Sequence, residues 1–227
     1  MDNNLIIVSV GGSLIVPDEI DTGFLKNFRS LILKQTRKGR RFAIMCGGGR
    51  TARKYQEASK SAVDTAKEDL DWLGIHSTRL NAHLLRTVFR GHAHPKIVKN
   101  PKEKIIFKEK ILIAAGWKPG FSTDSDAVLL AENLGIKKLV NMTDVDYVYD
   151  KDPRKFRGAK PMKNLTWNEF RNLLPKWWEP GMNAPLDPNA ARKAEKLGME
   201  VVIINGKKMK NLENCLEGKD FAGTRIR

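Results

Sequence analysis

Hydrophobic residues in this chain form short runs that alternate with longer stretches of helical period. The short runs, rich in isoleucine, leucine and valine, are typical of strands buried inside a sheet. We expect all five of these runs to be central strands: residues 5–10, 41–46, 111–115, 138–142 and 200–204. Between them, apolar positions three to four residues apart predict helices over 19–38, from 49 onward, over 78–90 and over 123–134. Strands that alternate with helices indicate an α/β fold with a largely parallel sheet.

Residues with special roles at helix ends support these boundaries. Gly135 follows the helix over 123–134 and suits a left-handed C-terminal cap. Thr166 and Glu169 have the spacing of a capping box, which predicts a short helix there. Asp187 before Pro188 predicts a capped helix over 189–197. Pro95 is expected to open a short edge strand that pairs near 105–107. No repeat or linker interrupts the pattern, so we expect one domain over residues 1–227.

Composition and charge narrow the class of protein. The chain has 227 residues, of which 41% are hydrophobic and 30% charged, an ordinary balance for a globular protein. No apolar run approaches the roughly 18 residues of a membrane span, and the polar start is not typical of a signal peptide. Two distant cysteines match no metal or redox spacing, which favours a reducing cytoplasm.

The net charge of +15 permits polyanion binding but does not identify a ligand. Six lysines lie between residues 96 and 110, with Phe107 as the only aromatic residue among them. Surfaces that bind single-stranded nucleic acid usually interleave more aromatic side chains, on which the bases stack. We therefore interpret this segment as a solvated surface around a hairpin, and nucleic acid is not the favoured partner.

Three glycine-rich loops carry the strongest chemical signal. Each follows the carboxyl end of a predicted strand, and in a parallel sheet these ends lie along one edge, where ligands bind. Glycine lets the backbone approach an anion closely, and a following helix adds free N–H donors. The loops cover residues 11–13, 47–50 and 119–124. Together they predict a site for a long polyphosphate or for two phosphorylated ligands, although no Walker motif or dinucleotide fingerprint is present.

These loops, in this order, resemble the amino acid kinase family and, within it, the uridylate kinases of the archaeal type. Residues 9–13 resemble the first phosphate loop, and 47–55 resemble the glycine triplet followed by an arginine and a tyrosine. Residues 73–82 are close to a stretch characteristic of these kinases. Residues 121–127 resemble the threonine–aspartate loop, 143–153 the nucleotide-base loop, and 223–226 the family's ending. The resemblance covers nearly the whole chain and implies a three-layer αβα sandwich with a largely parallel central sheet.

The resemblance also implies a role for each matching position. Residues that would bind ATP are Ser9, Val10, Gly11, Gly12, Ser13, Gly49, Arg53, Thr143, Asp144, Tyr149 and Asp152. Residues that would bind UMP are Gly48, Asp71, Trp117, Lys118, Pro119, Gly120, Phe121, Ser122 and Thr123. Asp124 and Arg53 would be catalytic, and Mg²⁺ would arrive with ATP rather than in a protein cage. A carboxylate at Asp71 also suits a ribose hydroxyl on chemical grounds.

The sequence departs from the family pattern at three places. Bacterial members have a lysine where Ser9 stands, so another cation must face the transferred phosphoryl group; Arg53, Arg50 and Lys118 are the candidates. Tyr147 replaces a common glycine, and a bulky residue disfavours positive φ. Trp117 and Lys118 make an unusual start to the UMP loop.

Several of these residues have simpler interpretations. Asp124 stands at a helix start and could cap it, as could Ser122 or Thr123. Asp126 is interpreted as a partner of the helix dipole and Asp187 as a helix cap rather than a ligand. Arg79 could pair across a subunit contact or lie on a solvated face. His92 and His94 lack the further ligands of a metal site. Trp177, Trp178 and Met182 could cover a rim or an interface.

The favoured hypothesis is a cytoplasmic kinase that makes UDP and ADP from UMP and ATP. The resemblance also suggests a homo-oligomer, a hexamer built from dimers, without membrane contact. Two alternatives remain. One is another small-acceptor kinase of the same fold, such as an isopentenyl phosphate kinase, although the histidine of that group is absent from residues 49–53. The other is a non-catalytic protein that binds oxyanions or nucleic acid.

Overall fold

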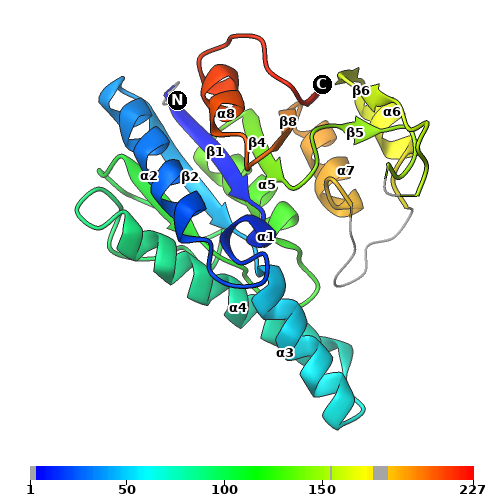
Figure 1. The fold of residues 1–227 in the computed structure, drawn as a ribbon. Coiled ribbons are helices and arrows are strands. Elements are labelled where there is room, and N and C mark those ends of the chain that lie inside the picture. Colours follow the sequence, from blue (N-terminus) through cyan, green and yellow to red (C-terminus); the bar gives the residue numbers. More distant parts are fainter. Residues whose placement is uncertain (1–3, 154, 176–183) are drawn as a thin grey trace.

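A twisted, mostly parallel sheet forms the centre of the molecule in the computed structural model, which describes residues 4–153, 155–175 and 184–227 (Figure 1). Seven strands follow the order β3-β2-β1-β4-β8-β9-β7. Their bounds are β1 Leu5–Val10, β2 Arg41–Cys46, β3 Ile111–Ala114, β4 Lys138–Thr143, β7 Asn164–Leu165, β8 Glu200–Asn205 and β9 Thr224–Ile226. The first five strands in this order pair in parallel, β9 runs antiparallel to β8, and β7 is parallel to β9. A separate antiparallel pair joins β5 (Val148–Tyr149) to β6 (Pro161–Met162).

Helices cover both faces of this sheet. Their bounds are α1 Gly12–Ile15, α2 Thr22–Arg37, α3 Gly49–Ala62, α4 Lys67–Val88, α5 Thr123–Leu134, α6 Trp167–Asn172, α7 Pro188–Lys196 and α8 Met209–Leu216. One buried cluster joins alternate strand residues to α1, α2, α4 and α8. A second cluster joins the other strand residues to α5, α6 and α7. Because successive strand side chains point to opposite faces, these two clusters are the two interfaces of an αβα sandwich.

The predicted strand and helix ends are mostly confirmed. Strands β1 and β2 have the predicted bounds, and α5 ends at Gly135 with φ 69°. The capping box of Thr166 and Glu169 is present, and the Asp187 side chain accepts a hydrogen bond from the Asn189 N–H. At these places the sequence carries a residue whose local chemistry ends or begins the element.

Predictions about two parts of the middle of the chain are wrong, the helix over 78–90 and the strands around residues 95–115. The helix predicted over 78–90 begins much earlier, at Lys67, and Leu80, expected on its apolar face, is 64% exposed. Helix α4 also packs along α3, which has no buried residue of its own and extends away from the sheet (Figure 1). The early start is a consequence of this helix pairing, because the first turns of α4 need not face the sheet.

The strand over 111–115 is also misplaced in the prediction, since β3 forms an edge of the sheet rather than its centre. No strand lies within residues 95–107; single bridges instead join Ala93 to Ile111 and Val98 to Ala114. Ile106 is 71% exposed and forms no hairpin. The lysine-rich segment therefore runs along the edge of β3 as an irregular cover.

Among the described residues, no helix has the length and apolar character needed to cross a membrane. Both cysteines, Cys46 and Cys215, are free and buried.

Candidate active site

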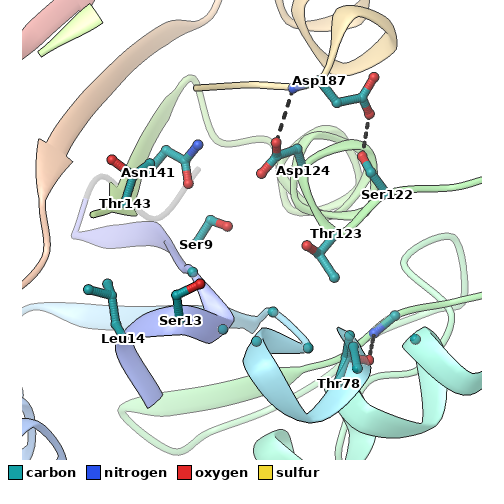
Figure 2. Close-up of a pocket in the computed structure, with 18 of the residues that line it drawn as sticks. Ser9, Ser13, Leu14, Thr78, Ser122, Thr123, Asp124, Asn141, Thr143 and Asp187 are labelled. Atoms are coloured by element: carbon teal, nitrogen blue, oxygen red, sulfur yellow. Dashed lines mark hydrogen bonds between the residues drawn. The ribbon is translucent and has the colours of Figure 1, made fainter. Parts of the chain in front are cut away.

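The three glycine-rich loops meet at one cavity of about 320 Å³ (Figure 2). They come from the carboxyl ends of β1 and β2 and from the segment between β3 and α5. This convergence was expected from the parallel sheet. Of the residues expected to bind ATP or UMP, the cavity is lined by Ser9, Gly11, Gly12, Ser13, Gly48, Gly49, Arg53, Asp71, Phe121, Ser122, Thr123, Thr143 and Asp144.

Backbone contact between the first two loops shapes the base of the cavity. A Cβ added to Gly12 would lie 2.0 Å from the Gly49 nitrogen. A Cβ on Gly49, which has φ +66°, would lie 2.3 Å from the Gly12 oxygen. The Gly47 N–H donates to the Val10 carbonyl at 2.9 Å, and the Val10 side chain is buried in the core, so Val10 can offer a ligand only its backbone. The two turns thus contact each other through backbone atoms alone, with no side chain between them.

Arg53 is the cation, of the three candidates, that lines the cavity. Its Nη2 atom donates to Ser13 Oγ at 3.4 Å. The Arg50 guanidinium instead lies 3.7 Å from Asp18 and 3.8 Å from Glu57. Lys118 places its Nζ atom 4.4 Å from the centre of the Trp117 ring. The arrangement therefore favours Arg53 as the positive group for a bound phosphate.

Ser9 and Asn141 lie side by side on neighbouring strands at the base of the cavity (Figure 2). Both residues are buried, and the Asn141 Nδ2 atom donates to the Pro185 carbonyl at 2.8 Å. The sequence analysis did not identify Asn141, although an amide in the middle of a buried strand was a signal that could have found it. Neither residue carries a charge, so Ser9 and Asn141 offer a ligand only neutral polar groups.

Asp124 is not the cap of α5, in contrast to one interpretation of the sequence. Ser122 is the N-cap, and its side chain accepts a hydrogen bond from the Ser125 N–H at 3.0 Å. The Asp124 carboxyl lines the cavity, and its Oδ2 atom accepts a hydrogen bond from the Asp187 N–H at 3.0 Å (Figure 2). Burial, and then the negative charge of Asp187, raise the pKa of Asp124 to about 7. Its ionised form is therefore costly unless a cation is close.

Asp187 caps α7 as predicted and also lines the cavity. Its Oδ1 atom accepts from the Asn189 N–H at 2.6 Å. Its Oδ2 atom accepts from the hydroxyls of Ser122 and Ser125. Asp187 consequently fastens the beginning of α7 to the beginning of α5.

Side chains from α4 and α5 hold the backbone of the loop expected to bind UMP. Asp71 accepts a hydrogen bond from the Gly120 N–H at 2.8 Å, so one of its oxygens serves the loop itself. Arg79 donates to the Gly116 and Trp117 carbonyls, so its guanidinium is engaged within the chain rather than on a solvated face. Asp126 is fully buried and accepts from the Trp117 N–H, a role beyond that of a dipole partner. Four further residues expected to bind UMP are not among those that line the cavity: Trp117, Lys118, Pro119 and Gly120.

A second cavity of about 270 Å³ adjoins the first. Thr143, Asp144, Tyr149 and Asp152, the four residues expected around adenosine, all line it. The two cavities share four lining residues, Thr143, Asp144, Ala184 and Pro185. Tyr147 also lines the second cavity without a positive φ, and its ring is perpendicular to that of Tyr149 at 6.3 Å. The two cavities therefore lie next to each other, with these four residues between them.

The remaining candidates lie elsewhere. His94 contacts Glu109 with 2.9 Å between Nδ1 and Oε2. Within the part of the chain that the structure describes, no group of three or more histidine, cysteine or acidic residues could hold a metal ion. Trp177, Trp178 and Met182 fall outside the described residues.

Known proteins with similar sequences and structures identify the family. The model of the amino acid kinase family matches residues 4–205. A protein named uridylate kinase from Pyrococcus abyssi is 37% identical over 219 residues, covering 94% of this chain and 96% of its own length. A uridylate kinase from Thermoplasma volcanium is 33% identical over 231 residues, covering 99% and 98%.

Solved structures agree with this assignment. The crystal structure of uridylate kinase from Archaeoglobus fulgidus has a TM-score of 0.83 at 25% identity, covering 98% of this chain and 99% of that one. A UMP kinase from Bacillus anthracis, at 18% identity, shares the fold with a TM-score of 0.79, covering 99% and 96%. The sequence comparisons and the structure comparisons therefore identify the same group of proteins, and it is consistent with the glycine turns and the two adjoining cavities. This chain belongs to the amino acid kinase family.

Proposed function

We propose that this protein transfers the γ-phosphoryl group of ATP to UMP, which gives ADP and UDP. One observation carries the proposal: two adjoining cavities share lining residues, and a glycine-lined phosphate cradle with Arg53 beside it lies in the first of them. Such a site suits two nucleotides bound end to end. The relatives named uridylate kinase, which match nearly the whole chain, support UMP as the acceptor.

In this proposal the donor nucleotide occupies the second cavity and extends into the first. Thr143, Asp144, Tyr149 and Asp152 surround the adenosine. The turns over 9–13 and 47–49, with Arg53, receive the phosphates. Backbone N–H groups suit this task because they are fixed before the ligand arrives and need not reorganise during the reaction.

The acceptor nucleotide lies between Asp71 and the loop that leads to α5. Gly48 and the segment 117–123 form its binding surface, with Phe121, Ser122 and Thr123 on the cavity wall. A phosphate oxygen of UMP is already a nucleophile, so phosphoryl transfer requires mainly alignment of the two nucleotides and stabilisation of charge. No covalent enzyme intermediate is needed.

Asp124 and Arg53 are the proposed catalytic residues. Arg53 neutralises charge on the transferred group. Asp124, whose backbone partner Asp187 fixes its carboxyl, orients cationic groups around the phosphates. The raised pKa of Asp124 fits this role, because a cation at the site favours the ionised carboxylate.

Mg²⁺ is the proposed cofactor, and the residues present fit a metal that is carried by the nucleotide. The described residues contain no cage of three or more ligating side chains, and Mg²⁺ usually keeps several waters and binds substrate phosphates. Asp124 would be the protein carboxylate that supports its hydration shell. When bound, the ion neutralises negative charge on the phosphates.

We further propose that residues 1–227 form one domain in which the UMP and ATP halves meet along the edge of the sheet. The family resemblance also supports a cytoplasmic homo-oligomer, a hexamer, that binds neither membrane nor nucleic acid. The two free, buried cysteines agree with a reducing compartment.

A coupled assay of ADP release tests the reaction. Purified protein with ATP and Mg²⁺ is expected to release ADP when UMP is added, and more slowly or not at all with CMP, dUMP, GMP or isopentenyl phosphate. A folded protein that binds ATP but releases no ADP with UMP would contradict the proposal. Preference for isopentenyl phosphate would transfer the assignment to another kinase of this fold.

A further inference from the structure

The backbone just after β3 is held by side chains rather than by a neighbouring strand. The Gly116 N–H donates to Thr78 Oγ1 at 2.8 Å, and its carbonyl accepts from Arg79 Nε at 3.3 Å. The Trp117 N–H donates to Asp126 Oδ2 at 2.9 Å, and its carbonyl accepts from Arg79 Nη2 at 2.8 Å. Three side chains thus satisfy all four polar backbone groups of two consecutive residues, which would otherwise cost free energy when withdrawn from water.

These side chains belong to helices on opposite faces of the sheet. Thr78 and Arg79 lie on α4, which packs on one face, and Asp126 lies on α5, which packs on the other. The guanidinium of Arg79 is planar and can bind two carbonyls at fixed geometry, which lysine cannot do. The arrangement ties the loop to both layers of the sandwich.

Burial of the Asp126 carboxyl costs free energy, because an ionised carboxylate loses its hydration. Its side chain is fully buried, and its Oδ1 atom has no hydrogen-bond partner within the described part of the chain. Burial, together with the nearby carboxyls of Asp187 and Asp124, raises the pKa of Asp126 to about 7, although the Trp117 N–H and Arg79 favour its ionised form. Its hydrogen bond from the Trp117 N–H offsets part of this cost, so the carboxyl and the loop backbone depend on each other.

The held segment leads directly into the cavity. The Trp117 and Phe121 rings are in contact, with centroids 4.9 Å apart, and Phe121 lines the cavity wall. Ser122, the next residue, caps α5 and also lines the cavity. A displacement of Trp117 would therefore displace Phe121.

We propose that Arg79 and Asp126 are positioning residues for the acceptor nucleotide: they fix the backbone of Gly116 and Trp117 and so set the place of Phe121 and Ser122 in the cavity. This inference rests on the proposed function. It predicts that their loss weakens the use of UMP and leaves the use of ATP unchanged, because the ATP loops leave other strands.

Steady-state kinetics test this division. Asp126→Ala removes one buried hydrogen bond and is expected to raise the KM for UMP about tenfold, and Arg79→Met, which removes two, at least as much. The KM for ATP should stay within about twofold of wild type in both variants. Asp126→Asn, which keeps an oxygen that can accept from the Trp117 N–H, is expected to restore most of the loss. Arg86→Met, two turns further along α4, and Glu132→Ala in α5 serve as matched controls and should leave both values unchanged.

Amide hydrogen exchange provides a readout that does not need activity. In the free wild-type protein, the Gly116 and Trp117 amides are expected to exchange slowly, and much faster in Asp126→Ala, while β1 and β2 stay protected. Equal losses for both nucleotides, or slow exchange that persists in Asp126→Ala, would overturn the inference. A wild-type protein without UMP-dependent ADP release would overturn the proposed function instead, and the exchange experiment would still decide whether these side chains hold the loop.

Discussion

Asp124 illustrates how the surroundings of a single carboxyl determine its use. Its backbone position is the second residue of α5, its oxygen is held by the Asp187 N–H, and its environment raises its pKa to about 7. A carboxyl group in this state is poised between its neutral and ionised forms near neutral pH. Binding of a phosphate-bound cation would select the ionised form.

Replacement of Asp124 separates catalysis from structure. Asp124→Asn retains an oxygen for the Asp187 N–H, and the Ser122 cap is unaffected, so the fold should survive. Loss of the carboxylate charge is expected to lower kcat by about a hundredfold, as for other single positioned groups that act in the transition state. Steady-state kinetics and a thermal melt on the same preparation measure both effects.

Glu132→Gln, an exposed substitution in the same helix, serves as the control. If Asp124→Asn has wild-type kcat and ordinary stability, Asp124 has no place in the mechanism. A change confined to the KM for UMP would instead assign Asp124 to ground-state binding.

At the level of secondary-structure elements, the phosphate cradle is made by two turns that touch through their backbones. Gly12 at the start of α1 and Gly49 at the start of α3 approach so closely that neither position has space for a side chain. The shape of the cradle is therefore determined by the absence of Cβ atoms, and α1 and α3 keep their relative position only while both residues are glycine.

Gly12→Ala tests this contact. The added Cβ would lie 2.0 Å from the Gly49 nitrogen, so the turns must separate. We expect a loss of stability of about 1–3 kcal/mol, typical of overpacking, together with weaker ATP binding. Urea unfolding and calorimetric titration with ATP measure the two effects. Gly158→Ala, where nothing lies within 4 Å of an added Cβ, should change neither, and equal behaviour of the two variants would contradict the contact.

The elements that could be predicted from sequence are those whose ends carry their own chemistry. Gly11 and Gly47 end β1 and β2, and Gly135 ends α5. The start of α4 was missed because Ala66 gives it no side-chain cap and its first turns pack on α3. Strands β5, β6, β7 and β9 have only two or three residues, too few to show a period.

In the site, too, residues with a local sequence signal were predicted and residues that depend on distant contacts were not. Loops that bind phosphate through glycine and helix starts are local, and their residues were identified from the sequence. The roles of Arg79, Asp126 and Asn141 depend on contacts with residues 9 to 44 positions away, which only the folded chain brings together. Spacing along the sequence carries no sign of such contacts.

For the molecule as a whole, the shifted pKa values of Asp124 and Asp126 and that of Glu213 have opposite effects on how stability depends on pH. Burial raises the pKa of Asp124 and Asp126 to about 7. In contrast, hydrogen bonds from Lys210 and Lys34 lower the pKa of Glu213 to about 2, where α8 packs on α2. The first pair binds protons more tightly in the folded state than in the unfolded state, and Glu213 binds them less tightly.

The stability of the protein is therefore expected to depend on pH in two ranges. As pH rises from about 4, the unfolded value of an aspartate, through about 7, the unfolded chain loses protons that Asp124 and Asp126 retain, so these two residues lower the free energy of unfolding. As pH falls from about 4 towards 2, the contribution of Glu213 is lost. Stability should be greatest at mildly acidic pH.

A double variant isolates the upper range. At pH 8, Asp124→Asn/Asp126→Asn should unfold at a higher urea concentration than wild type, because its free energy of unfolding is larger by on the order of 1 kcal/mol or more. At pH 5 the two proteins should differ little. Urea titrations at pH 5, 6.5 and 8 measure this difference. Parallel curves for wild type and the double variant across the three pH values would contradict the assignment.

The irregular segment along β3 gives the molecule protection against aggregation. An edge strand exposes unpaired backbone groups that can pair with another chain, and β3 is made of buried, apolar residues that would suit such pairing. The segment covers this edge, and Arg41 secures it by donating to the Phe107 carbonyl at 2.9 Å and stacking on the Phe107 ring at 4.3 Å. Its six lysines outnumber its two glutamates, so the segment has a net positive charge that repels an approaching copy. Part of the positive charge that would suit a polyanion ligand thus lies beside the edge of the sheet, where it opposes pairing with another copy of the chain.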